Sequence, residues 1–445
     1  MRRTIPSWIR LTLASVMLST IAVIPAVHTS WAATSRAAGK VTLTWEVQND
    51  AFWIPISKTI IKAYTALHPN VSVTLELVPD AQYTQKLFLQ AASKTLPDVL
   101  ETADAYTVPF ASHHIILNMQ PYANADHSFN VSDIYPTFLN LGRLQGDPGL
   151  YMMPFSADAI VMFYNKNMFD AAGVAYPTAT WTFQDFLNAT RKLTKRDGSG
   201  KVTQWGLELL VTGWSTWVPW LNGFGGSILT PDGKHAGLSQ PGSIKGLQAL
   251  ADMFLKYKVA PGSSVVFPSD PFLSGTAAID FAVHANVAGF KQAIGTKFKW
   301  DVQGDPAFPN GTHVNAEGTA GFAVSNNSKQ RAAAWDIVKF VGSVQGQTIL
   351  AKLGVTMPIR KSMLSSPVWH VAGLNNQAFA HAIQTGETPP QLPLDAAINC
   401  GTVYQGLMQT TLQTMWNQIL RGTPVVTAAK TADAAINGCI SSQGY

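Results

Sequence analysis

The chain has 445 residues, of which 47% are hydrophobic and 13% are charged, and its formal net charge is +5. This length favours two domains or lobes, and the apolar share is sufficient for large cores. The charged share is about half the usual one, which argues against long disordered tails and against a nucleic-acid-binding protein.

The first 33 residues have the pattern of a secretory signal peptide. Three arginines precede an uncharged segment at residues 11–27, and small residues follow at Ser30-Trp31-Ala32. This order predicts export, with cleavage after Ala32 or Ala33. A retained membrane anchor is the alternative, because 17 uncharged residues fall just short of a membrane span.

Three strands alternating with two helices open the predicted fold. Residues 41–47 and 71–78 alternate between apolar and polar side chains, which is typical of strands, and residues 97–101 form a third run. This order implies a mostly parallel sheet, in which ligands bind beyond the carboxyl ends of the strands. The loops after the first and third strands therefore supply candidate ligand contacts: Asn49, Asp50, Trp53, Asp104 and Tyr106.

A well-capped helix is predicted within residues 153–196. After an apolar run and a turn, Thr182 precedes a helical pattern, and Asp185 three residues later completes a capping box. Trp181 is placed to pack on Phe186 as a hydrophobic staple. By itself this pattern indicates a strand and helices of an α/β protein.

Residues 212–226 hold the densest aromatic cluster of the chain, with Trp214, Trp217 and Trp220 three residues apart. Tryptophan stacks well on the apolar face of a sugar ring, which makes Trp214 and Trp217 candidate ligand contacts. The same spacing also suits one face of a helix packed in a core. Both interpretations stay open for each tryptophan.

The C-terminal part is predicted to be helical and cross-linked. A helical pattern at residues 408–419 is followed by a last helix that starts at Thr423-Pro424. The two cysteines of the chain, Cys400 and Cys439, bracket these helices. In an exported protein such a pair predicts a disulfide, worth roughly 3–4 kcal/mol for a loop of about 38 residues. Two buried free thiols are the alternative.

Several short motifs, taken in order over roughly residues 41–440, resemble one known family. Each is degenerate, but their number and order argue against chance. They include Leu96-Pro97-Asp98-Val99, Pro154-Phe155, Tyr164-Asn165-Lys166, Thr180-Trp181, Phe272-Leu273-Ser274-Gly275, Gly318-Thr319-Ala320 and Pro358-Ile359-Arg360. The family is that of the extracytoplasmic sugar-binding proteins of ABC importers, the group that includes maltose-binding protein.

The resemblance implies an α/β, two-lobed periplasmic-binding-protein fold of type II, in which each lobe is a mostly parallel sheet flanked by helices. Hinge crossings are expected at Met153–Asp158, at Gly318–Phe322 and after Arg360. The implied division is a signal peptide at residues 1–33, an N-terminal lobe at 34–155 and 319–361, and a C-terminal lobe at 156–318 and 362–445.

The resemblance also adds candidate ligand contacts. Ser156 and Asp158 lie at the first expected crossing, and Gly318 and Arg360 lie at the later ones. Where relatives usually carry Gly-x-Trp with a sugar-stacking tryptophan, this chain has Val283-His284-Ala285. His284 is the candidate substitute for that tryptophan.

The implied function is capture of a sugar or oligosaccharide by hinge closure and its delivery to the membrane permease subunits of an ABC importer. Such a protein is expected to be an extracellular or periplasmic monomer, without a lipid-accepting cysteine, catalytic residues, cofactor, metal or bound nucleic acid. Two alternatives remain. One is the same fold binding glycerol phosphate or a polyamine, and the other is a secreted carbohydrate-active enzyme.

Overall fold

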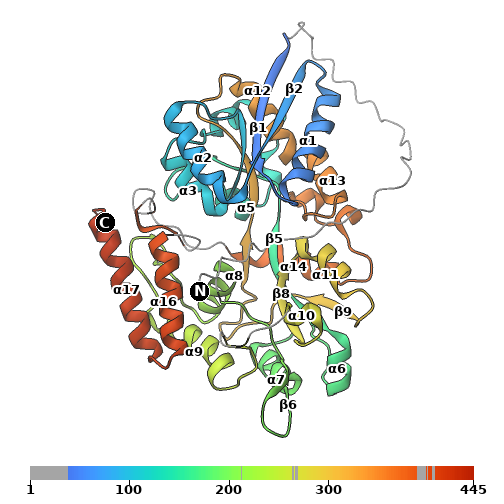
Figure 1. Ribbon diagram of the computed structural model, residues 1–445, viewed down its shortest axis with the longest axis vertical. Helices are drawn as coiled ribbons and strands as arrows, with labels where there is room; N and C mark the ends of the chain where they lie inside the picture. The colour runs from blue at the N-terminus through green and yellow to red at the C-terminus, as the bar shows by residue number, and fades with distance from the viewer. Residues whose placement is uncertain are drawn as a thin grey trace.

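The computed structural model has two lobes joined by extended segments that run between them (Figure 1). It describes residues 39–211, 213–262, 265, 269–387, 397, 399–402 and 406–444. The predicted signal peptide, residues 1–33, lies outside these ranges. Within them, no helix combines the length and the apolar character that a membrane span requires. The predicted two-lobed α/β fold is confirmed.

The N-terminal lobe, at the top of Figure 1, is built on a five-stranded sheet with the order β2-β1-β3-β11-β4. β1 pairs in parallel with both β2 and β3, as predicted, because helices return the chain between these strands. β11 enters from the other lobe and therefore runs antiparallel to β3 and β4. The strands are β1 (Val41–Gln48), β2 (Val71–Val78), β3 (Val99–Ala103), β4 (Met153–Pro154) and β11 (Ala320–Val324).

Helices cover this sheet on both faces, and buried aromatic side chains fill the space between the layers (Figure 1). Trp45 of β1 packs edge-on against Phe322 of β11, with ring centres 4.6 Å apart. The helices are α1 (Trp53–Leu67), α2 (Asp80–Ser93), α3 (Asp104–Ser112), α4 (Gln120–Ala125), α5 (Pro136–Leu141), α12 (Arg331–Gly342) and α13 (Val344–Lys352).

The C-terminal lobe is built on a second sheet with the order β12-β10-β5-β8, and β9 also pairs with β5. Its strand directions differ from the mostly parallel sheet predicted for this lobe, because β5 is antiparallel to β8, β9 and β10. The physical reason is the hinge: β5 enters the lobe from the crossing, whereas β8, β9 and β10 all run in the opposite direction, back toward it. The strands are β5 (Asp158–Asn165), β8 (Ile279–Val283), β9 (Trp300–Gln303), β10 (Asn315–Gly318) and β12 (Gly386–Glu387).

The predicted capping box is confirmed at the start of α7. Asp185 N donates to Thr182 Oγ1 over 3.2 Å, and Thr182 N donates to Asp185 Oδ2 over 2.9 Å. The helices of this lobe are α6 (Lys166–Ala172), α7 (Phe183–Leu193), α8 (Trp214–Asn222), α9 (Pro241–Leu255), α10 (Pro271–Ser274), α11 (Val287–Ile294) and α14 (Asn376–Thr385). A small hairpin of β6 (Lys195–Arg196) and β7 (Val202–Gln204) follows α7.

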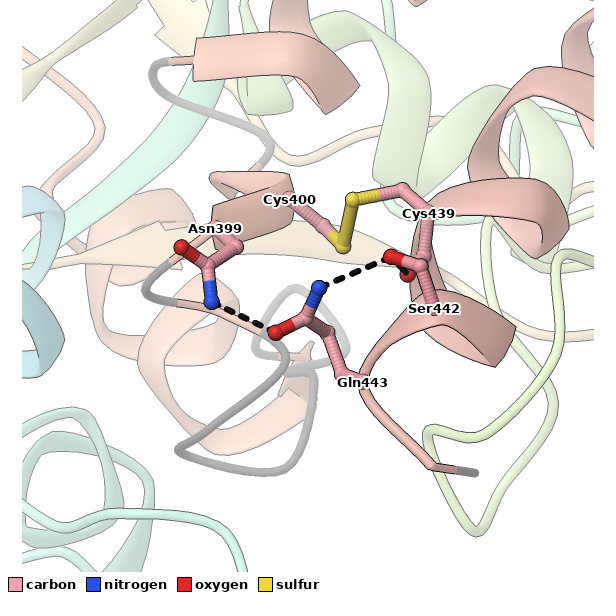
Figure 2. Close-up of a disulfide and its surroundings, with 5 residues drawn as sticks. All are labelled: Asn399, Cys400, Cys439, Ser442 and Gln443. Carbon is pink, nitrogen blue, oxygen red and sulfur yellow. Dashed lines mark hydrogen bonds between the residues drawn. A yellow bond between two sulfur atoms is a disulfide. The ribbon is translucent and has the colours of Figure 1, made fainter.

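The last two helices, α16 (Gly406–Leu420) and α17 (Val425–Ser442), lie side by side at the edge of the C-terminal lobe (Figure 1). The predicted disulfide is confirmed, since Cys400 and Cys439 are bonded to each other. Figure 2 shows this bond beside a hydrogen bond from Asn399 to Gln443. The cross-link therefore ties the end of α17 to the segment that precedes α16.

Replacing both cysteines with serine is expected to lower the free energy of unfolding by about 3–4 kcal/mol, because the unfolded chain regains the freedom that the cross-link removes. Urea denaturation measures the loss, and reduction of the wild-type disulfide should reproduce it. Ser442→Ala, which leaves the disulfide intact, is the control. Equal denaturation midpoints for the double variant and the wild type would contradict the expectation.

Candidate functional site

Two adjacent crossings connect the lobes. The chain passes from β4 to β5 through residues 155–157 and returns from β10 to β11 through Thr319. Thr319 Oγ1 donates to the Ser156 carbonyl over 2.6 Å, and Ala320 N donates to Ser156 Oγ over 2.8 Å. Ala157 N also donates to the Met357 carbonyl, which brings a third segment against the first crossing.

Two aspartates lie beside these crossings. Ser156 Oγ donates to Asp158 Oδ2 over 2.9 Å, and Thr319 N donates to Asp104 Oδ2 over 3.2 Å. Asp158 faces Gly318 across the β5–β10 pair. Burial raises the pKa of Asp158 to about 7, with the charge of Asp104 adding to the rise and the Ser156 hydroxyl opposing it. The two carboxyl groups are therefore electrostatic neighbours at the junction of the lobes.

The loops after β1 and β3 lie at the same edge of the N-terminal sheet, because the two strands are paired. Asn49 is exposed and Tyr106 is half-buried. Asp50 Oδ1 accepts hydrogen bonds from Phe52 N over 2.9 Å and Trp53 N over 2.8 Å at the start of α1. Burial raises the pKa of the Asp50 carboxyl, and these two hydrogen bonds partly oppose the rise. The predicted loops thus present amide, carboxyl and phenol groups at one edge.

Two of the predicted tryptophan contacts lie in the cores of the lobes. Trp53 is 6% exposed and Trp217 is 1% exposed. Trp53 packs edge-on against Phe155 with ring centres 5.6 Å apart, and Trp217 packs in the same way against Trp416 at 6.0 Å. For Trp217 the packed helix face is the interpretation that fits. The side chain of Trp214 lies outside what the structure describes.

His284 and Arg360 are also buried and have partners within the protein. His284 Nε2 lies 3.1 Å from the Trp369 carbonyl, and burial lowers the pKa of His284 to about 4, so the ring is neutral near pH 7. Arg360 is 3% exposed, and its Nη1 lies 3.0 Å from Asp133 Oδ2. The structure therefore gives both side chains a role in holding the fold together.

A cavity of about 660 Å³ lies in the C-terminal lobe, and no sequence pattern predicted it. Every described residue that lines it belongs to that lobe, and four of them carry carboxyl groups: Glu208, Asp270, Asp280 and Asp305. A local signal was present, because Glu208 and Asp280 each interrupt an apolar run. Nothing in the sequence indicated that the four would line one space.

A profile of the bacterial extracellular solute-binding proteins matches residues 51–348 of this chain. A putative binding protein from Brucella abortus is 24% identical over 367 residues, which cover 81% of this chain and 86% of that protein. The match therefore spans most of both chains.

Solved structures of substrate-binding proteins superpose on almost the whole chain. The ABC substrate-binding protein Lmo0181 from Listeria monocytogenes, in complex with cycloalternan, gives a TM-score of 0.75 at 23% identity and covers 90% of this chain and 99% of that one. The sugar-binding protein MalE from Xanthomonas citri gives 0.75 at 18% identity, covering 91% and 98%. The cyclic α-maltosyl-1,6-maltose binding protein from Arthrobacter globiformis gives 0.75 at 19% identity, covering 91% and 100%. Likeness at this identity shows a shared fold.

Proposed function

Because this chain belongs to the bacterial extracellular solute-binding proteins, we propose that it captures a neutral sugar or oligosaccharide between its lobes and delivers it to the permease of an ABC importer. Closure about the crossings would bring the C-terminal lobe onto a ligand first held by the N-terminal lobe. The protein acts by binding rather than by catalysis, as its family does.

The observation that carries this proposal is the pair of carboxyl groups, Asp104 and Asp158, at the junction of the lobes. Carboxylate oxygens accept hydrogen bonds from sugar hydroxyls, and such charge-assisted bonds are stronger than neutral ones. The proposed contacts are Asn49, Asp50, Asp104, Tyr106, Ser156 and Asp158. None of these is cationic, which disfavours a phosphate-bearing solute such as glycerol phosphate.

We also propose the boundaries of the two lobes and export of the protein across the membrane. The hydrogen-bonded crossings support lobe boundaries near residues 155 and 319, with the third boundary near residue 361. Removal of residues 1–33 would release the protein as an exported monomer, and no cysteine near that site accepts a lipid. The partner would be the transmembrane permease, and the ligand would reach it in the closed form.

The test is a titration with neutral oligosaccharides followed by tryptophan fluorescence and calorimetry. The panel starts with α-glucans because of the ligands of proteins with a similar fold. One was solved with cycloalternan bound and one with maltotriose bound, and a third is a cyclic α-maltosyl-1,6-maltose binding protein. Saturable binding without new reducing ends supports the proposal. Binding of polyamines or glycerol phosphate with no response to any sugar would overturn it, and release of reducing ends would indicate an enzyme.

Asp158→Asn is expected to weaken binding of the best oligosaccharide about ten- to a hundredfold, the cost of losing one hydrogen bond to a charged group. The measurement is calorimetry at pH 8, where the Asp158 carboxyl is ionised. Asp252→Asn is the matched control: this carboxylate is paired with Lys256 on α9, a helix that lies away from the crossings in Figure 1. Equal affinities for the Asp158 variant and the wild type would remove this residue from the site.

A further inference from the structure

The cavity in the C-terminal lobe extends toward the crossings, because Ile160 of β5, two residues after Asp158, is among its lining. Most of its wall comes from α7, α8, β8, α10 and α11, which lie in the lower half of Figure 1. None of the proposed carbohydrate contacts is among its described lining residues. Its volume of about 660 Å³ lies within the range of small-molecule sites.

The described lining has four carboxyl groups and no lysine, arginine or histidine. Glu208, Asp270 and Asp280 form one group in which Glu208 and Asp270 share a hydrogen bond. Burial raises the pKa of Glu208 to about 8, and the charge of Asp270 adds to the rise. Burial and the charges of these two neighbours also raise the pKa of Asp280 well above its ordinary value. Glu208 and Asp280 are half-buried and Asp270 is exposed, and Glu208 and Asp270 also accept backbone hydrogen bonds from Phe272 and Leu273. Three acids this close together are stabilised further by a proton or a cation that offsets their mutual repulsion.

Asp305 supplies an independent observation in the same cavity. It is 8% exposed, and its Oδ1 atom is buried without a hydrogen-bond partner among the described residues. Its other oxygen has one long contact, 3.4 Å from Asn315 Nδ2. A buried polar atom without a partner is costly, so Asp305 leaves an unsatisfied carboxyl oxygen in the lining of the cavity.

Aromatic side chains form much of the remaining wall. Phe183 and Phe308 are stacked with ring centres 5.8 Å apart, and Phe281 contributes a third ring. Apolar faces of this kind suit the hydrocarbon part of a ligand, and aromatic rings also attract cations. Among the described residues no group of three or more acids, histidines or cysteines has the arrangement of a metal site. The walls and the carboxyl groups therefore fit an organic cation better than a bare metal ion.

We propose that this cavity binds a small amine, whose ammonium group is held by the carboxyl groups of Glu208, Asp270 and Asp280 while its apolar body lies against the phenylalanine rings. The site goes beyond the proposed carbohydrate function and does not depend on it. Because the carboxyl groups must lose protons to pair with the ammonium, the affinity rises with pH toward pH 9, by about tenfold per pH unit where one proton is released.

The probe is 2-phenylethylamine, compared by calorimetry with its neutral counterpart 2-phenylethanol on the full chain. We expect saturable amine binding about tenfold or more tighter than alcohol binding, because only the amine pairs with the carboxyl groups. Asp280→Asn and Glu208→Gln are each expected to weaken amine binding at least fivefold, whereas Asp252→Asn leaves it unchanged. Thermal unfolding of each variant checks that the lobe is folded.

Three results would overturn the amine site. One is equal affinity for the amine and the alcohol, and another is wild-type amine binding by both cavity variants. The third is competition between the amine and an oligosaccharide, which would place both at the crossings. Unchanged oligosaccharide affinity in Asp280→Asn supports separate sites. If Asp158→Asn loses carbohydrate binding but keeps amine binding, the amine site stands independently of the carbohydrate site.

Discussion

Replacing Arg360 with methionine is expected to lower the free energy of unfolding by about 3–5 kcal/mol, the usual cost of removing one partner of a buried ion pair. Arg360 is 3% exposed, and its Nε donates to the Gly342 carbonyl over 2.6 Å. Its Nη1 contacts Asp133 Oδ2 and the Asn130 carbonyl. Methionine fills part of the volume but removes the cation beside Asp133, which keeps its hydrogen bonds from Ser362, and it takes this donor from both carbonyls.

Stability and ligand affinity separate the two interpretations of this residue. The resemblance made Arg360 a candidate ligand contact, whereas its buried partners predict lower stability with unchanged oligosaccharide affinity. Chemical denaturation and calorimetry on Arg360→Met measure the two quantities, and Lys361→Met, an exposed neighbour, is the control. Weaker binding without a loss of stability would restore the arginine to the ligand site.

Features with local signals were predictable from the sequence. The capping box of Thr182 and Asp185 requires residues three apart. The alternation of residues 41–47 predicted the strand, although its second half is buried on both faces, Glu46 included. The disulfide followed from export and from the count of two cysteines. Each of these features depends on nearby residues in the chain or on composition, so each could be predicted without knowing the tertiary structure.

Features that depend on distant segments were less predictable. The spacing of Trp217 suited both a ligand contact and a core position. Its burial and the approach of Trp416 from α16 favour the core, and both depend on the folded structure. The family resemblance placed Asp158 at the crossing. The raised pKa of the Asp158 carboxyl, however, comes from burial and from the charge of Asp104 on another element. The cavity of the C-terminal lobe was missed for the same reason, since its four acids come from four separate segments.

Glu317 is expected to make the protein less stable as the pH rises. It is fully buried in β10, and a side chain at Gly386 would overlap its carboxyl group, so the packing around it is close. Burial raises the pKa of Glu317 from 4.5 to about 8, and a hydrogen bond with the Thr137 hydroxyl partly opposes this rise. A folded-state pKa above the unfolded one means that the stabilisation is complete below about pH 4.5 and is lost as the pH rises through about 8. The loss amounts to about 4–5 kcal/mol, at about 1.4 kcal/mol per pH unit.

Glu317→Gln isolates this effect, because glutamine has nearly the shape of the protonated acid and does not titrate. The two proteins should have similar unfolding free energies near pH 4, and the variant should become the more stable one above pH 8. Other buried acids, such as Glu101 and Asp305, add the same pH dependence to both proteins, so the difference between the two curves reports Glu317 alone. Glu76→Gln, on the exposed face of β2, is the control and should leave the curve unchanged. Parallel curves for Glu317→Gln and the wild type would mean that this carboxyl titrates normally, and the crossing at β10 would then be open to water.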